Sequence, residues 1–125
     1  MSDRTIYRFE DIEWHVPEAE GTDAEEAARA GEQGAGRKFL AQGDGGFYAQ
    51  IVQIPSNFEA PAHAHNHAEI FMVLEGSCTF GGQQMSKYDM TVVPEGGAYG
   101  FTAGPDGVRF LVIRNGVASF AKVAS

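Results

Sequence analysis

The chain has 125 residues, a formal net charge of −8 and a single cysteine. This length corresponds to one compact domain with enough core to fold without disulfides, so Cys78 is expected to be a buried structural thiol in a cytoplasmic protein. The acidic balance disfavours nucleic-acid and membrane partners, and the chain shows neither an apolar stretch of transmembrane length nor a signal peptide.

Residues 1–35 are acidic and rich in alanine and glycine, unlike the remainder of the chain. Thr22 and Glu25 fit a capping box, and alanines then recur at helical spacing, which predicts a short helix over about 22–30. Because the apolar face of this helix is small, a solvated flexible arm is an equal alternative. We interpret 1–35 as an N-terminal arm or lid and 36–125 as the folded barrel.

The second region consists of short apolar runs separated by turn residues. Strands are predicted at 37–42, 46–54, 58–65, 69–75, 77–81, 83–86, 90–93, 98–102, 107–114 and 117–121. Glycine, proline, asparagine and aspartate mark turns over 43–46, 55–57, 81–82, 94–97 and 104–107, and a break at Gly76 separates the strands over 69–75 and 77–81. Many short strands at close spacing predict an all-β sandwich or barrel.

Histidines and a carboxylate occupy alternate positions near the middle of the chain. Side chains at i and i+2 share one side of a strand, so His63, His65 and Glu69 could converge on one point. Two imidazoles and one carboxylate are a known set of metal ligands, especially for iron(II). The alternative is a histidine cluster on a surface loop. His67 has the same parity but falls in the predicted turn between the two strands.

This stretch resembles the first motif of the cupin superfamily. His63-Ala-His65, three residues, Glu69 and then six residues to Gly76 match that motif throughout. The second motif is matched in frame over 88–99, but Tyr88 stands at its opening glycine and Tyr99 at its histidine. The resemblance covers about 36–115.

A cupin is a jelly-roll barrel, or double-stranded β-helix, of two facing antiparallel sheets with a metal at its mouth. The resemblance therefore implies an all-β barrel of this type, here with an N-terminal arm and at most one short helix. It also implies one divalent transition metal on His63, His65 and Glu69, with iron the first choice and manganese, nickel, cobalt or zinc as alternatives.

Tyr99 leaves three arrangements open. The metal keeps only its three ligands and has open faces, with Tyr99 as a catalytic hydrogen-bond donor or acid/base group. Alternatively Tyr99 binds as a phenolate, or His67 substitutes as a ligand. The competing interpretation is that Tyr99 is a packing aromatic in a site that only binds.

Phe71 shares parity with Glu69, and Phe101 shares parity with Tyr99. Both are predicted to form an apolar, substrate-binding wall beside the metal. Such a wall would suit a small aromatic or diketone-like substrate. No cluster of lysines or arginines is apparent nearby, and Arg109 alone does not indicate a phosphate site.

These residues favour a metal-dependent dioxygenase acting on a small organic substrate. A non-redox lyase, isomerase or dehydratase is the alternative, with the metal as Lewis acid and Tyr99 as acid or base. A third possibility is a non-catalytic cupin that binds a metal or a small ligand. Cupins commonly pair through sheet edges, so a homodimer is also expected.

Overall fold

The computed structural model describes residues 4–15, 34–65, 67–97, 99–116 and 120–122, with backbone alone for 61–65, 99 and 120–122. These residues form eight strands: β1 (Gly36–Gln42), β2 (Tyr48–Ile54), β3 (Glu59–His65), β4 (Glu69–Phe80), β5 (Gln83–Ser86), β6 (Met90–Val93), β7 (Tyr99–Arg114) and β8 (Phe120–Lys122). Single 3-10 turns lie at η1 (Phe9–Asp11) and η2 (Asp44–Gly46). The predicted helix over 22–30 lies outside the described residues. No helix in the described ranges is long and apolar enough to cross a membrane.

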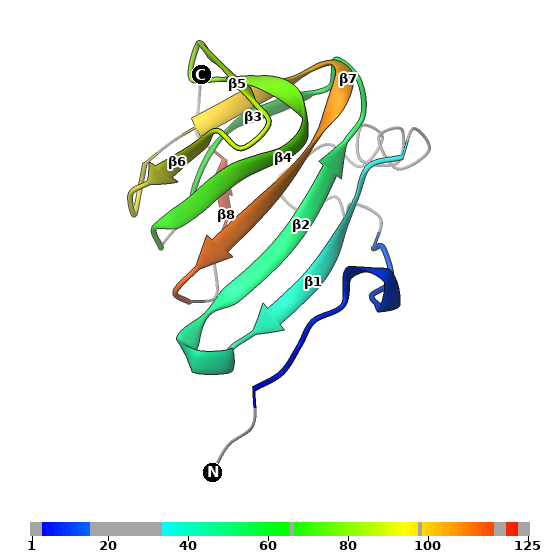
Figure 1. The fold of residues 1–125 in the computed structure, drawn as a ribbon. Coiled ribbons are helices and arrows are strands. Elements are labelled where there is room, and N and C mark those ends of the chain that lie inside the picture. The colour runs from blue at the N-terminus through cyan, green and yellow to red at the C-terminus, as the bar shows by residue number, and fades with distance from the viewer. Residues whose placement is uncertain (1–3, 16–33, 66, 98, 117–119, 123–125) are drawn as a thin grey trace.

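Two long strands, β4 and β7, belong to both layers of the barrel (Figure 1). Residues 108–114 of β7 pair with β2, whereas residues 99–102 pair with β3, and every pairing is antiparallel. β4 lies against β7 over most of its length and pairs with β6 near its start and with β5 near its end. This arrangement confirms the all-β jelly roll.

The strand break predicted at Gly76 and the turn predicted over 104–107 do not end strands, so four predicted strands become two. Gly76 and Gly107 have φ of +74° and +78°, and the β4–β7 register shifts beside Gly76. A Cβ on Gly76 would lie 2.1 Å from the carbonyl oxygen of Gly107. The glycines therefore permit bulges at which the paired strands bend from one layer into the other.

The side of the sheet that faces the barrel interior is called the inner face below. Register places Val52, Phe110 and Val73 side by side on this face, and all three are buried. Phe71, Phe101 and Phe110 pack there as an aromatic cluster, with ring centroids 4.3–5.7 Å apart. This alternation of buried and exposed positions is the pattern expected of strands with one face on a core.

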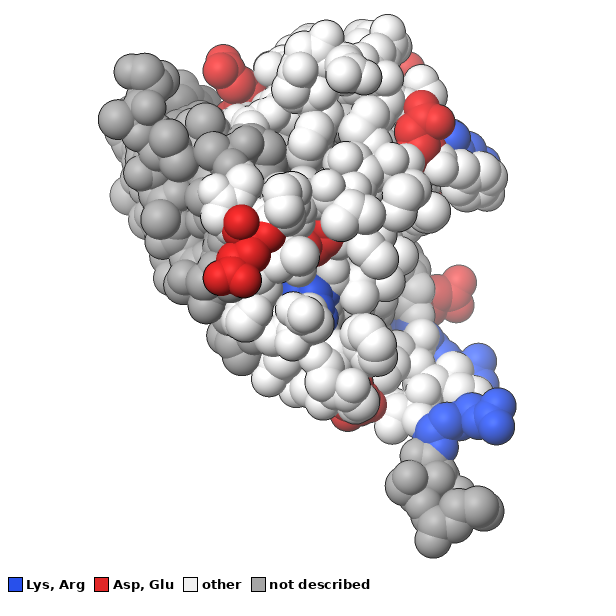
Figure 2. All heavy atoms as spheres, turned by 90° about the vertical axis from the view of Figure 1, so that its left-hand side faces the viewer, with Lys and Arg blue, Asp and Glu red and all other residues white. Residues whose placement is uncertain are grey.

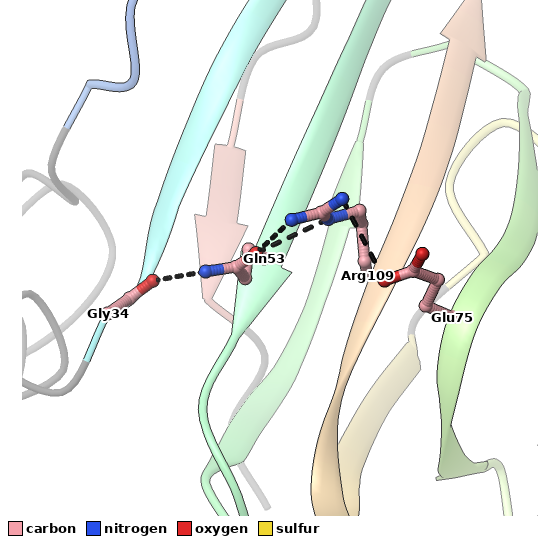
Figure 3. Close-up of polar contacts among 4 residues, drawn as sticks. All are labelled: Gly34, Gln53, Glu75 and Arg109. Atoms are coloured by element: carbon pink, nitrogen blue, oxygen red, sulfur yellow. Dashed lines mark hydrogen bonds and ion pairs between the residues drawn. The ribbon is translucent and has the colours of Figure 1, made fainter.

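The opposite, outer face carries a polar network across three strands (Figure 3). Arg109 donates to Gln53 Oε1 from Nη2 at 2.7 Å and from Nε at 3.3 Å, and Gln53 in turn donates to the Gly34 carbonyl at 2.9 Å. The Arg109 guanidinium also lies 3.8 Å from the Glu75 carboxylate. Arg109 therefore has a structural role on the outside of the barrel.

Residues 4–15 run alongside β1 and are attached to the outer face (Figure 1). Lys38 is buried, donates to the Phe9 carbonyl at 2.6 Å, and lies 3.7 Å and 5.0 Å from the ring centroids of Phe9 and Trp14. His15 then forms a backbone bridge with Arg37 on the edge of β1. These contacts cover an exposed sheet edge and satisfy a buried ammonium group. The division of the chain into 1–35 and 36–125 stays a prediction.

Candidate functional site

Glu69 is the first residue of β4 and lies on the inner face. Glu69 is only 2% exposed to solvent. It lies directly opposite Arg114, the last residue of β7. Arg114 Nε donates to Glu69 Oε2 at 2.8 Å. The other carboxylate oxygen, Oε1, is buried and accepts no hydrogen bond from any residue in the described part of the chain.

A buried carboxylate without a cationic partner is unfavourable, so the Arg114 contact partly explains why Glu69 is tolerated here. Oε1 nevertheless remains a buried hydrogen-bond acceptor, and burial has removed the solvent molecules that would otherwise donate to it. An oxygen of this kind suits a metal ion, because carboxylate oxygens are common ligands of divalent transition metals. Glu69 therefore fits the role of a metal ligand whose second carboxylate oxygen, Oε2, is fixed by a hydrogen bond from Arg114.

The backbone register pairs two of the other predicted site residues. His63 on β3 lies directly opposite Tyr99 on β7, and on its other side it pairs with Lys122 on β8. His65 follows two residues later, and residues 66–68 alone separate it from Glu69. The side chains of His63, His65 and Tyr99 lie outside the described set, in which no group of three His, Cys, Asp or Glu side chains could hold a metal. Their convergence stays a prediction.

His67 is half-buried, and its ring packs against the backbone of Gly116. A Cβ placed on Gly116 would lie 2.7 Å from Cε1 and Nε2 of the imidazole. The glycine therefore provides the space that the ring occupies. In this position the imidazole lies beside the segment that follows β7, and its substitution for Tyr99 as a ligand stays a prediction.

The two predicted substrate-binding aromatics belong to the packed core. Phe71 is 0% exposed and Phe101 is 6% exposed, and both contact Phe110. Phe71 is two residues from Glu69 on the same face, so the aromatic cluster lies next to the carboxylate. Direct contact of these rings with a substrate stays a prediction.

Sequence reasoning missed the arginines of the interior. It considered Arg109, which lies on the outer face, whereas Arg114 and Arg37 occupy inner-face positions opposite Glu69 and Val52. The available signal was parity, because Arg114 is in phase with Val112 and the other buried residues of its strand. Which carboxylate Arg114 meets depends on the β4–β7 register, and local sequence does not reveal it.

Figure 2 views the molecule from the side at which β4 begins and β7 ends. A small patch of basic atoms is surrounded there by uncharged atoms, and acidic atoms lie close by. This end of the barrel thus combines opposite charges within a mainly neutral surface.

No family model matches the sequence, and the search of curated proteins finds no match either. Several solved structures are similar in fold. The polyketide cyclase RemF from Streptomyces resistomycificus is 20% identical with a TM-score of 0.71, over 100% of this chain and 87% of that chain. An RmlC-like cupin from Shewanella frigidimarina NCIMB 400 is 18% identical with a TM-score of 0.68, over 90% of each chain. KdgF from Halomonas sp. is 20% identical with a TM-score of 0.67, over 90% of this chain and 94% of that chain.

These likenesses extend over nearly the whole length of the chain, and they agree with the two-layered antiparallel barrel and with the motif that runs from His63 to Gly76. The chain has the fold of the cupin superfamily.

Proposed function

We propose that this protein binds one divalent transition metal through His63, His65 and Glu69 and acts on a small organic substrate. The observation that carries the proposal is the buried Glu69 Oε1, which has no hydrogen-bond donor among the described residues. A bound ion would supply Lewis acidity and, in the case of iron, redox chemistry with dioxygen.

The protein's own groups have separable roles in this proposal. Arg114 holds Glu69 Oε2, which leaves Oε1 as the carboxylate oxygen that would bind the metal. Tyr99, opposite His63 in the register, orients the substrate or transfers a proton through its hydroxyl group. The aromatic cluster around Phe71 keeps water from the inner side of the site.

The first reaction we propose is that of a dioxygenase, because three protein ligands leave coordination positions for both a substrate and dioxygen. A non-redox reaction is the second candidate. Two structurally similar proteins are a polyketide cyclase and a DMSP lyase, and neither name denotes an oxidation.

Metal content tests the site independently of any reaction. Protein purified without added metal is subjected to elemental analysis, alongside the Glu69→Gln variant and a Glu75→Gln control on the outer face. We expect close to one metal ion per chain for the parent and the control, and a loss of at least about tenfold in affinity for Glu69→Gln. If the Glu69→Gln variant binds metal as fully as the parent protein, Glu69 is not a metal ligand.

Oxygen uptake separates the two reactions. Candidate substrates are supplied to the metal-loaded protein in an oxygen electrode, with anaerobic samples in parallel. Iron-dependent oxygen consumption supports the dioxygenase, whereas equal turnover under anaerobic conditions with zinc, nickel or manganese supports the non-redox enzyme. Replacing Tyr99 with Phe should then reduce kcat more than it raises KM.

The proposed homodimer has a candidate surface on the outer face. Met90 and Val92 of β6 are 46% and 59% exposed and lie opposite Met72 and Ile70 of β4. An apolar strip of this kind favours contact with a second copy. Sedimentation velocity at several concentrations tests it, and a monomer at every concentration would contradict it.

A further inference from the structure

A glutamine side chain lies on the inner face among apolar neighbours. Gln50 is in phase with the buried Val52 on β2 and is itself only 6% exposed. The backbone register places Phe39 of β1 on one side of Gln50 and Val112 of β7 on the other. Neither of these flanking side chains has a hydrogen-bond acceptor. A buried amide in such surroundings requires explanation, because buried polar groups are nearly always hydrogen-bonded.

The oxygen and the nitrogen of the Gln50 amide differ in their partners. Oε1 accepts from Arg37 Nη1 at 3.4 Å, and Arg37 makes a further interaction besides this one. The contact fixes the orientation of the amide, because a guanidinium has no acceptor and only the amide oxygen can meet it. The nitrogen lies on the other side of the amide group, and within the described ranges it donates no hydrogen bond.

The free amide nitrogen of Gln50 is within reach of a ligand. In the part of the chain that the structure describes, Glu69 Oε1 is the fully buried side-chain oxygen or nitrogen that lacks a partner. Gln50 Nε2 also lacks one but is not sealed in this way, so it borders open space on the inner side of the sheet. Small-molecule sites typically have apolar walls with a few polar groups, and the surroundings of Gln50 match that description.

Gln50 lies one small molecule away from the candidate metal ligand. Gln50 is directly opposite Val112, and Val112 is directly opposite Phe71. Phe71 is two residues from Glu69 on β4. Two strand spacings and two residues along a strand place the backbones of Gln50 and Glu69 about 12 Å apart. Both side chains extend from the inner face and shorten this gap, so a small organic molecule with one end at the metal reaches Gln50 with its other end.

We propose that the Gln50 amide donates a hydrogen bond to a carbonyl oxygen of the substrate, at the end remote from the metal. The inference rests on the proposed function, since the metal would hold the other end. An N–H group selects an oxygen acceptor, and a neutral amide between apolar side chains suits a neutral carbonyl, because it cannot compensate a buried negative charge. The substrate is then an aromatic or diketone-like molecule with oxygen atoms at both ends.

Catechols that differ in one substituent test this contact. 4-Acetylcatechol and 4-ethylcatechol share a metal-chelating end, and only the first has a carbonyl at the other end; 3,4-dihydroxybenzoate has a carboxylate there. Calorimetry on the metal-loaded full chain compares the parent with Gln50→Met, which keeps the length of the side chain, and with Gln50→Glu, which keeps its shape but has no N–H group. Gln84→Met on the exposed side of β5 is the control.

The quantity to compare is the ratio of the acetylcatechol affinity to the ethylcatechol affinity, because the ratio cancels effects of the substitution on the metal itself. We expect this ratio to fall about fivefold in both Gln50 variants and to stay unchanged in the control. Equal weakening of both catechols by Gln50→Met would indicate a structural role and overturn the proposal. A larger Gln50-dependent gain for the benzoate than for the ketone would overturn it too, because the recognised group would be a carboxylate.

The contact is also measurable if the proposed function fails and the protein holds no metal. The side-chain amide signal of Gln50 in the proton–nitrogen NMR spectrum is assigned from its absence in Gln50→Met. Acetophenone and ethylbenzene are then added to the metal-free protein. A shift of this signal with acetophenone alone supports the Gln50 contact and leaves only the metal site refuted. No shift, or equal shifts with both compounds, refutes the contact.

Discussion

Replacing Arg114 with methionine should destabilise the protein more than an exposed arginine substitution would. The Arg114 side chain is 15% exposed and the Glu69 side chain is 0% exposed, with 2.8 Å between Nε and Oε2. Removing one partner of a buried ion pair leaves the other charge without compensation, which typically costs about 3–5 kcal/mol. Because Arg114 retains some exposure, we place the expected loss near the lower end, at about 3 kcal/mol.

A loss of this size should lower the midpoint of thermal unfolding by about 12 °C in a domain of this length. Urea unfolding monitored by circular dichroism, with metal removed by chelation, measures it directly. The Glu69→Gln/Arg114→Met double variant should be more stable than Arg114→Met alone, because neither charge is then buried. A loss below about 1 kcal/mol for Arg114→Met, or strict additivity in the double-mutant cycle, would contradict the role assigned to this pair.

Three further predictions concern the barrel. Gly76→Ala should cost about 3 kcal/mol of unfolding free energy, because the residue has φ +74° and its Cβ would lie 2.1 Å from the Gly107 carbonyl; full retention of stability in urea would disprove this. Tyr88 also has positive φ, at +72°, and is 67% exposed, so Tyr88→Gly should stabilise the protein by about 0.5–1 kcal/mol, and a lower thermal midpoint would count against it. Burial raises the pKa of Cys78 to about 11, so its thiolate forms only as pH rises toward that value; alkylation of the native protein near pH 8 should be slow, and rapid labelling would contradict the packing.

Periodicity and turn residues were sufficient to predict most strands. The expected 83–86 and 90–93 coincide with β5 and β6, and 37–42 differs from β1 by a single residue. The errors arose at glycines. Gly76 looks like a strand break in local sequence, but beside the Gly107 carbonyl it allows a bulge inside a longer strand. Whether a glycine ends or bends a strand depends on what the partner strand does at that point.

In the second motif, Tyr88 keeps a backbone conformation that usually requires glycine. Tyr88 stands where the motif has glycine, and its φ of +72° is the left-handed conformation that glycine adopts without steric cost. The departure from the motif thus leaves the backbone conformation in place. Its side chain is accommodated because it extends into solvent.

Alternation and spacing alone were enough to single out Glu69 as an inward residue and to place it two positions from Phe71 on a common face. Strand periodicity is a local property, so it can be read along a single stretch of chain. The pairings of Glu69 with Arg114 and of Gln50 with Arg37 are properties of register between segments that are distant in sequence. Only the tertiary structure decided them, because a shift of one residue between strands would turn each arginine to the opposite face.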